Sequence, residues 1–203
     1  HLYEGMTHPG WSWQMLRHGM PRFENVQGLL GDESAGLTIA ARVGQNLDAA
    51  FDWDGLSRLR ERWPGKLLVK GVEHPMDALR LASMGVDGIW VSNHGGRQLD
   101  GAQPSARALP RLHRALKGQV PLILDSGIRR GVDILKARAL GASAVAIGRA
   151  ALFGAACGGE AGVLRALDIL TDELRLSMKL AGTPRIEGVD RDLLAPDTVP
   201  DTF

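Results

Sequence analysis

The sequence of 203 residues contains one cysteine, Cys157, so it cannot form an internal disulfide and is unlike the small disulfide-stapled secreted domains. It also lacks an excess of charge, because 24 Lys and Arg against 23 Asp and Glu give a net charge of +1 and no general basic field for nucleic acid. No run of about 18 apolar residues occurs, and the first residues lack the charged-then-apolar order of a secretory signal. These absences favour a cytoplasmic protein that neither binds nucleic acid nor spans a bilayer.

Two further kinds of site are missing from the sequence. The histidines show no metal-ligand spacing with Cys157 or with one another, so we expect no metal site. The glycine patterns of the Rossmann dinucleotide fold and of the P-loop are absent as well. Cys157 lies in LFGAACGGE, and we interpret it as a small helix residue rather than a nucleophile.

Glycine is what the sequence has in excess, with 26 residues, and this indicates many tight turns. Residues 1–50 carry turn signals and little periodicity, so we predict a variable loop segment with short helices there. Trp11, Trp13, Leu16 and Met20 are candidates for an apolar face on the surface of the inner membrane. Because the chain begins in polar sequence without methionine, we expect a fragment, a processed chain or one of two pieces.

A regular alternation begins after residue 51. Leu56, Leu59 and Trp63 have helical spacing, and Pro64-Gly65 ends that helix. Short apolar runs then alternate with amphipathic segments of helical spacing, and the runs are LLVKG from 67, GIWVSN from 88, PLILDSG from 121 and AVAIGR from 144. Runs that are apolar on both faces and alternate with helices predict a parallel sheet covered on both sides. The two candidate folds are an open doubly wound sheet and an eightfold barrel.

The ends of the runs favour the barrel. Each run finishes with functional groups, which are Lys70, then Ser92 and His94, then Asp125, and then Gly148 and Arg149. A TIM barrel binds its ligands at the rim formed by the C-terminal ends of all its strands. An open sheet has such groups mainly at the one switch point where the strand order reverses. We therefore predict an α/β fold, the C-terminal half of a (β/α)8 TIM barrel with strands 5 to 8 in residues 51–194, followed by a tail in residues 195–203. We expect this half to be stable only with a complementary N-terminal half-barrel or with a second copy of itself.

The segment SNHGGRQLDG, residues 92–101, carries the densest chemical signal. It places His94 and Arg97 three residues apart just past a strand, where two glycines let the chain bend sharply. A histidine there can accept a proton near neutral pH, and an arginine can bind a carboxylate through two parallel hydrogen bonds. Together they describe a site for an acid with a removable proton. The structural alternative is that His94 caps the strand end and Arg97 pairs with Asp100.

Positive charge gathers at the same rim in three other places. Lys70 ends a buried strand, so its ammonium needs a partner, which is either a cofactor that becomes negative on reduction or a neighbouring carboxylate. The segments DSGIRRG (125–131) and IGR (147–149) combine glycines, free N–H groups, a helix N-terminus and arginines. This combination makes a phosphate cradle. The alternative is that the arginines are simply solvated at turns.

Lys70, SNHGGRQLDG, DSGIRRG and IGRA occur in an order and spacing that resemble the FMN-dependent α-hydroxy-acid dehydrogenase and oxidase family. The likeness runs from about residue 11 to residue 194, and HPGWSWQML makes it most similar to the bacterial membrane-linked L-lactate and mandelate dehydrogenases. The resemblance implies a TIM barrel that oxidises a small L-2-hydroxy acid to the 2-oxo acid with FMN. It also favours a respiratory electron acceptor.

The resemblance further implies a role for each site residue. Lys70 would stabilise the negative charge of the reduced flavin, His94 would be the catalytic base, and Arg97 would bind the substrate carboxylate. The residues that would hold FMN are Lys70, Ser92, Asp125, Ser126, Gly127, Ile128, Arg129, Gly148 and Arg149. We therefore expect an FMN-dependent 2-hydroxy-acid dehydrogenase. The alternative is a catalytically silent flavin-binding or assembly module.

Overall fold

A computed structural model of the chain describes residues 2–19 and 50–195 and divides the chain into two compact units, residues 1–52 and 53–203. The described part of the first unit contains two helices, α1 (Leu2–Thr7) and α2 (Pro9–His18), in agreement with the short helices predicted for this segment. Met20 of the predicted apolar face lies outside the described residues, as do the rest of the loop segment up to residue 49 and residues 196–203 of the tail.

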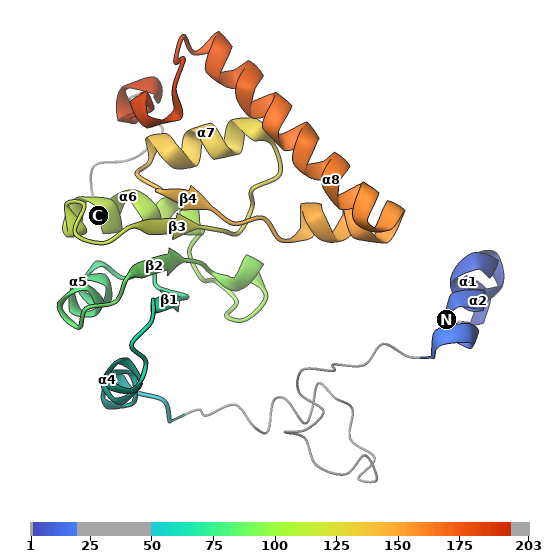
Figure 1. Cartoon of the computed structure of the whole chain (residues 1–203), viewed down its shortest axis with the longest axis horizontal. Helices are drawn as coiled ribbons and strands as arrows, with labels where there is room; N and C mark the ends of the chain where they lie inside the picture. The colour runs from blue at the N-terminus through green and yellow to red at the C-terminus, as the bar shows by residue number, and fades with distance from the viewer. Residues whose placement is uncertain (1, 20–49, 196–203) are drawn as a thin grey trace. The chain divides into compact units, whose positions relative to one another are not determined.

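The second unit alternates strands and helices as the sequence predicts (Figure 1). Its elements in chain order are α4 (Trp53–Arg62), β1 (Leu68–Lys70), α5 (Pro75–Ser83), β2 (Gly88–Val91), η3 (His94–Gly96), α6 (Ser105–Leu116), β3 (Leu122–Leu124), α7 (Gly131–Ala139), β4 (Ala144–Val145), α8 (Arg149–Leu180), η4 (Ile186–Gly188) and η5 (Arg191–Leu193). Each apolar run forms one strand, and each amphipathic segment between two runs forms a helix. The prediction of an α/β fold is confirmed.

The strands form one parallel sheet in the order β1-β2-β3-β4. Every strand lies beside the next one in the chain, so the order never reverses within this sheet, as it does at the switch point of a doubly wound fold. The register aligns Lys70 with Trp90, and Trp90 with Ile123. Because the strands are parallel, their C-terminal ends meet at one edge, and the loops that follow them are neighbours there.

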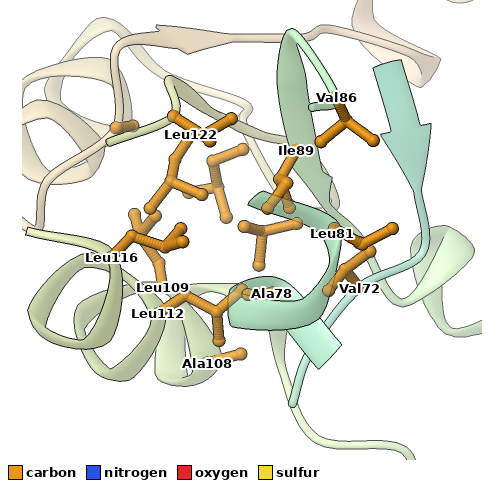
Figure 2. Packing of buried hydrophobic residues seen from close by; sticks show 14 of the residues in the cluster. Val72, Ala78, Leu81, Val86, Ile89, Ala108, Leu109, Leu112, Leu116 and Leu122 are labelled. Carbon is orange, nitrogen blue, oxygen red and sulfur yellow. The ribbon is translucent and has the colours of Figure 1, made fainter. Parts of the chain in front are cut away.

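One face of the sheet packs against the helices and forms the core (Figure 2). Ile89 of β2 and Leu122 of β3 are 0% and 2% exposed on this face. Helix α6 presents Leu109, Leu112 and Leu116 at helical spacing, and all three are at most 1% exposed. Removing side chains of this size from water is the main favourable contribution to folding.

The opposite face of the sheet is much less covered. Leu68 is 44% exposed, and Trp90 and Ile123 are only partly buried. The indole Nε1 of Trp90 is buried but has no hydrogen-bond partner among the described residues. The prediction that both sides of the sheet are covered therefore holds for one face only in residues 50–195, because the described helices pack on the other face.

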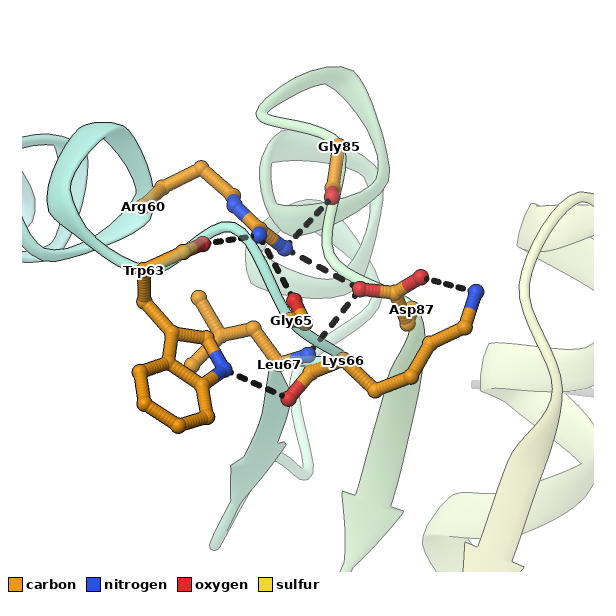
Figure 3. A network of polar contacts seen from close by, with 7 residues as sticks. All are labelled: Arg60, Trp63, Gly65, Lys66, Leu67, Gly85 and Asp87. Carbon is orange, nitrogen blue, oxygen red and sulfur yellow. Dashed lines mark hydrogen bonds and ion pairs between the residues drawn. The ribbon is translucent and has the colours of Figure 1, made fainter.

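At the N-terminal edge of the sheet, a polar network joins α4 to the beginnings of β1 and β2 (Figure 3). Asp87 accepts hydrogen bonds from Lys66 Nζ at 2.7 Å, from the Leu67 N–H at 2.9 Å and from Arg60 Nη1 at 3.0 Å. Arg60 also donates to three backbone carbonyl oxygens of the adjoining turns. The hydrogen bond from Lys66, followed by those from Leu67 and Arg60, lowers the pKa of Asp87 to about 2. The network fixes where the two strands begin, and nothing in the sequence had singled it out.

Helix α8 has the length and composition of a membrane span, with a mean hydropathy of 1.2 over its most apolar 18 residues. It is not a single rod, however, because Gly158 and Gly159 leave the helical conformation. The two segments on either side cross so closely that a Cβ on Gly162 would lie 1.9 Å from the carbonyl oxygen of Gly154. The only 18-residue stretch of α8 with at most two charged residues, 150–167, includes this break. The apolar stretch therefore consists of two helical segments that cross at Gly154 and Gly162, and none of its residues is buried within the described part of the chain.

Candidate functional site

The loops that follow the four strands enclose a cavity of about 900 Å³ at the C-terminal edge of the sheet. Ionisable side chains enter the cavity from every strand end, and they are Lys70, His94, Arg97, Asp125, Arg129 and Arg149. The other lining residues are Gly95, Ser126, Gly127, Ile128, Ala146, Gly148, Ala150, Leu152 and Phe153. Of the site residues predicted from the sequence, only Ser92 does not line this cavity.

Lys70 has the partner that its position after a buried strand requires. Its Nζ donates to Asp125 Oδ2 at 2.7 Å and to Ser92 Oγ at 2.6 Å, and it lies 5.2 Å from the ring centre of Trp90. Of the two partners that the sequence left open, the neighbouring carboxylate is present in the structure. The Lys70 side chain is nevertheless 43% exposed, so its cavity side remains open to a second anion. Ser92 is 3% exposed and does not reach the cavity itself, but its Oγ accepts hydrogen bonds from Lys70 and from the His94 N–H, and both of these residues line the cavity.

Asp125 is ionised at neutral pH. Burial raises the pKa of its carboxyl group, but hydrogen bonds from Lys70, Ser92 and Ser126 outweigh that effect and bring the pKa below its usual value. The Asp125 side chain is only 17% exposed, so water screens its attraction to Lys70 less than on an open surface. The ion pair therefore persists in the wall of the cavity at physiological pH.

His94 begins the short 3-10 turn η3 in a strained backbone conformation. Its φ of +58° lies in the left-handed region, which residues other than glycine seldom adopt. The His94 N–H donates to Ser92 Oγ at 3.0 Å, and the Gly96 N–H donates to Asn93 Oδ1 at 3.1 Å. Strain of this kind persists only where the surroundings hold it, and it clusters at functional sites.

Arg97 follows η3 and lines the same cavity as His94. Its side chain is exposed and forms no ion pair with Asp100, or with any other acid in residues 2–19 and 50–195. The structural alternative for Arg97 is therefore not the arrangement that the chain adopts. Arg149 approaches the turn from α8, with its Nη2 3.7 Å from where a Cβ on Gly95 would stand. Two guanidinium groups thus flank the loop that carries His94.

The turns after β3 and β4 add open backbone donors to this positive charge. Ser126 and Gly127 have φ values of +71° and +113°, which bends the backbone around the cavity. Helix α8 begins at Arg149, with Gly148 as its N-cap and no side chain bonded to its first N–H groups. Arg129 and Arg149 form no ion pair within the described ranges. Open N–H groups at a helix N-terminus and two guanidinium groups suit a phosphate.

The N-terminus of α7 is satisfied by acidic side chains of the chain itself. Asp133 Oδ2 accepts from the N–H groups of Arg129 and Arg130, and Glu173 Oε2 accepts from that of Gly131. Arg130 Nε also donates to both oxygens of Glu173 at 2.8 and 2.9 Å, and this contact lowers the pKa of the Glu173 carboxyl group. The two adjacent arginines therefore differ: Arg129 lines the cavity, whereas Arg130 connects the start of α7 to α8 through its ion pair with Glu173.

The cavity also has an apolar part, which was not predicted from the sequence. Leu152 and Phe153 line it beside Arg149 and are 66% and 68% exposed. Their spacing of three and four residues from Arg149 on a helix is the signal that could have found them. Among residues 2–19 and 50–195, no group of three His, Cys, Asp or Glu side chains could hold a metal ion. The cavity therefore combines a wall that carries Lys70 and three arginines, a histidine and an apolar patch.

Comparisons with known proteins match nearly the whole chain. The family model described as FMN-dependent dehydrogenase matches residues 1–196. The L-lactate dehydrogenase of Yersinia pestis (strain Pestoides F) is 40% identical over 195 residues, which are 96% of this chain and 51% of that protein. The L-lactate dehydrogenase of Yersinia pseudotuberculosis serotype O:1b (strain IP 31758) matches with the same identity and coverage. The chain thus spans about half the length of the curated relatives it matches.

Solved structures that resemble the chain include enzymes named for mandelate. The crystal structure of the monotopic membrane protein (S)-mandelate dehydrogenase is similar with a TM-score of 0.87 and 40% identity, over 97% of this chain and 52% of that one. The structure of a mandelate oxidase with (S)-4-hydroxymandelic acid is similar with a TM-score of 0.67 and 41% identity, over 69% of this chain and 39% of that one.

Proposed function

The chain belongs to the family of FMN-dependent dehydrogenases, and on that premise we propose that the protein oxidises an L-2-hydroxy acid, such as lactate or mandelate, to the 2-oxo acid at this cavity. The observation that carries the proposal is the convergence of Lys70, His94 and Arg97 on one cavity that also contains an open anion cradle. Similar proteins that act on lactate and mandelate support the choice of substrate class.

The residues of the cavity fit FMN, the cofactor of the family. Arg129, Arg149 and the uncapped N–H groups of α8 would hold its phosphate, because an anion is stabilised by such donors and by the helix N-terminus. Gly127 lets the backbone run close to the bound group. The partly exposed ammonium of Lys70 would stand ready to offset negative charge on the bound cofactor. When bound, FMN supplies the acceptor for two electrons, which the side chains of the cavity cannot provide.

Arg97 and His94 have different roles toward the substrate. Arg97 binds the substrate carboxylate through two parallel hydrogen bonds and so fixes the position of the α-carbon. His94 accepts a proton from the substrate as two electrons leave it. The CH–OH group loses two electrons and two protons to become the 2-oxo acid. One proton goes to His94, and the two electrons and the other proton would go to FMN when it is bound. The strained turn at His94 and the unpaired state of Arg97 within the described residues support these roles.

The sheet forms half of a (β/α)8 barrel that an N-terminal half completes. The uninterrupted strand order supports this, as does the uncovered face with Leu68, Trp90 and Ile123, where a closed barrel has its filled interior. The buried Nε1 of Trp90 then meets an acceptor from the completing half. Size-exclusion chromatography with light scattering of the isolated chain tests the proposal. We expect self-association or aggregation, and a monomer that unfolds cooperatively would refute it.

The protein lies on the cytoplasmic surface of the inner membrane and passes electrons to a respiratory acceptor. Helix α2 exposes Trp11, Trp13 and Leu16 by 58%, 65% and 81%, and aromatic and apolar side chains of this kind insert at membrane interfaces. The similar (S)-mandelate dehydrogenase is a monotopic membrane protein. The double variant Trp13→Ser, Leu16→Ser should float less with anionic lipid vesicles than the unaltered protein. Equal flotation would count against this location.

The catalytic proposal is tested on the purified protein, assembled with the half that completes its barrel, by its absorbance spectrum and by turnover with an artificial electron acceptor. We expect bound FMN, and turnover of at least one L-2-hydroxy acid from a panel that includes lactate, mandelate and longer acids. Bound flavin without turnover of any of them would instead identify a flavin-binding or assembly module. Protein that binds no FMN would refute the assignment of the cradle.

A further inference from the structure

A chain of hydrogen bonds in the wall of the cavity joins the ends of β1, β2 and β3, and the backbone of His94 closes it into a ring. Its members are the side chains of Lys70, Ser92, Asp125 and Ser126 and the backbone N–H groups of His94 and Gly95. The two N–H groups belong to the peptide units on either side of the His94 Cα. The ring therefore holds both peptide planes that define the backbone conformation of His94.

The charged pair in the ring sets the direction of its hydrogen bonds. The Lys70 ammonium can only donate, and it donates to Asp125 and to Ser92 Oγ. The Asp125 carboxylate can only accept, so Ser126 Oγ donates to its Oδ1 at 2.7 Å. Each serine oxygen then keeps a lone pair for one of the two backbone N–H groups.

These two backbone contacts hold a conformation that the chain would seldom adopt without them. Ser92 Oγ lies 3.0 Å from the His94 nitrogen, and Ser126 Oγ lies 2.9 Å from the Gly95 nitrogen. His94 and Ser126 both have positive φ, at +58° and +71°. Residues with a Cβ occupy this region at a cost in free energy, so neighbouring contacts must hold them there. The serine hydroxyls supply these contacts.

We propose that Ser126 and Ser92 are positioning residues whose hydroxyls, anchored on the ion pair, hold the backbone of His94 so that its imidazole faces the substrate. This inference rests on the proposed function, in which His94 is the base. Arg97 is held differently, because Asn93 fixes the turn that leads to it. Loss of a serine hydroxyl therefore affects proton transfer more than substrate binding.

The variants Ser126→Ala and Ser126→Gly in the FMN-loaded protein test this role. Both remove the hydroxyl, but only glycine relieves the strain of a positive φ. We expect both to lower kcat about tenfold, the effect of losing one well-formed hydrogen bond, and to change the dissociation constant of a 2-oxo acid by less than about twofold. Hydrogen exchange at the Gly95 amide should become faster in both. The control Ser83→Ala removes an exposed hydroxyl on α5 that donates to the Arg80 carbonyl, and it should change neither quantity.

Unchanged hydrogen exchange at Gly95 would overturn the role of Ser126, and so would faster exchange with an unchanged kcat. A normal kcat in the glycine variant alone would overturn it too, because backbone strain and not the hydroxyl would then be decisive. Equal losses of kcat and of 2-oxo-acid affinity would overturn the separate holding of His94 and Arg97. Failure of the proposed function is distinguishable, since the unaltered protein would then turn over no 2-hydroxy acid while the exchange measurement still tests the ring.

Discussion

Replacing Arg97 with methionine should weaken the binding of a 2-oxo acid without disturbing the fold. The Arg97 side chain is exposed, lines the cavity, and forms no ion pair in residues 2–19 and 50–195, so its removal breaks no ion pair there. Two charge-assisted hydrogen bonds to a carboxylate contribute about 2 to 3 kcal/mol. A loss of 1.4 kcal/mol of binding free energy raises the dissociation constant about tenfold, so the dissociation constant should rise about 30-fold to 140-fold.

The assay for Arg97→Met is a titration of the FMN-loaded protein with a 2-oxo acid, followed by the change in flavin absorbance. Arg97→Lys keeps the charge but loses the planar fork, so its dissociation constant should fall between those of the unaltered protein and the methionine variant. Arg58→Met, which removes an exposed arginine from α4 outside the cavity, is the matched control and should bind normally. An unchanged dissociation constant in Arg97→Met would refute the role of Arg97 in carboxylate binding.

Three further predictions address the base, the core and the polar network. His94→Gln should retain bound FMN and abolish turnover, and a near-normal rate in the purified variant would exclude His94 as the base. Leu112→Ala should lower the free energy of unfolding by about 2 to 5 kcal/mol in urea denaturation, because Leu112 is fully buried; a loss below about 1 kcal/mol would contradict that packing. The pKa of Asp87 is lowered from 3.8 to about 2, so its contribution to stability is present above pH 3.8 and is lost as the pH falls toward 2. Thermal unfolding across this range should show a smaller pH dependence in Asp87→Asn, and an unchanged slope would argue against the network.

The order of strands and helices could be predicted because each βα unit is encoded locally. Each apolar run is short, each amphipathic segment has helical spacing, and Gly85 and Gly141 adopt positive φ just after α5 and α7, as glycines that end helices commonly do. The family predicted from SNHGGRQLDG is confirmed as well. The break at Gly158 and Gly159 was not predicted, because it depends on the close crossing of two helical segments. Nor could periodicity tell which elements cover each face of the sheet.

The sequence predicted residues that line one cavity, but not the contacts between them. Parallel strands bring their C-terminal ends together, so residues after each strand were expected to share one cavity. The partner of Lys70 could not be chosen, because Asp125 lies 55 residues away and the contact depends on the register of the sheet. The different roles of Arg129 and Arg130 depend in the same way on Glu173, which lies 43 residues beyond Arg130 on α8.

Anaerobic mixing of the FMN-loaded protein with an L-2-hydroxy acid tests the central claim most directly, because it isolates the reaction at this cavity from any electron acceptor. We expect L-lactate or L-mandelate to bleach the flavin absorbance, the D enantiomer to leave it unchanged, and His94→Gln with the same FMN content to show no bleaching by either. Bleaching at the normal rate in His94→Gln, or none by any L-2-hydroxy acid in the unaltered protein, would contradict the claim that these residues form the site of 2-hydroxy-acid oxidation.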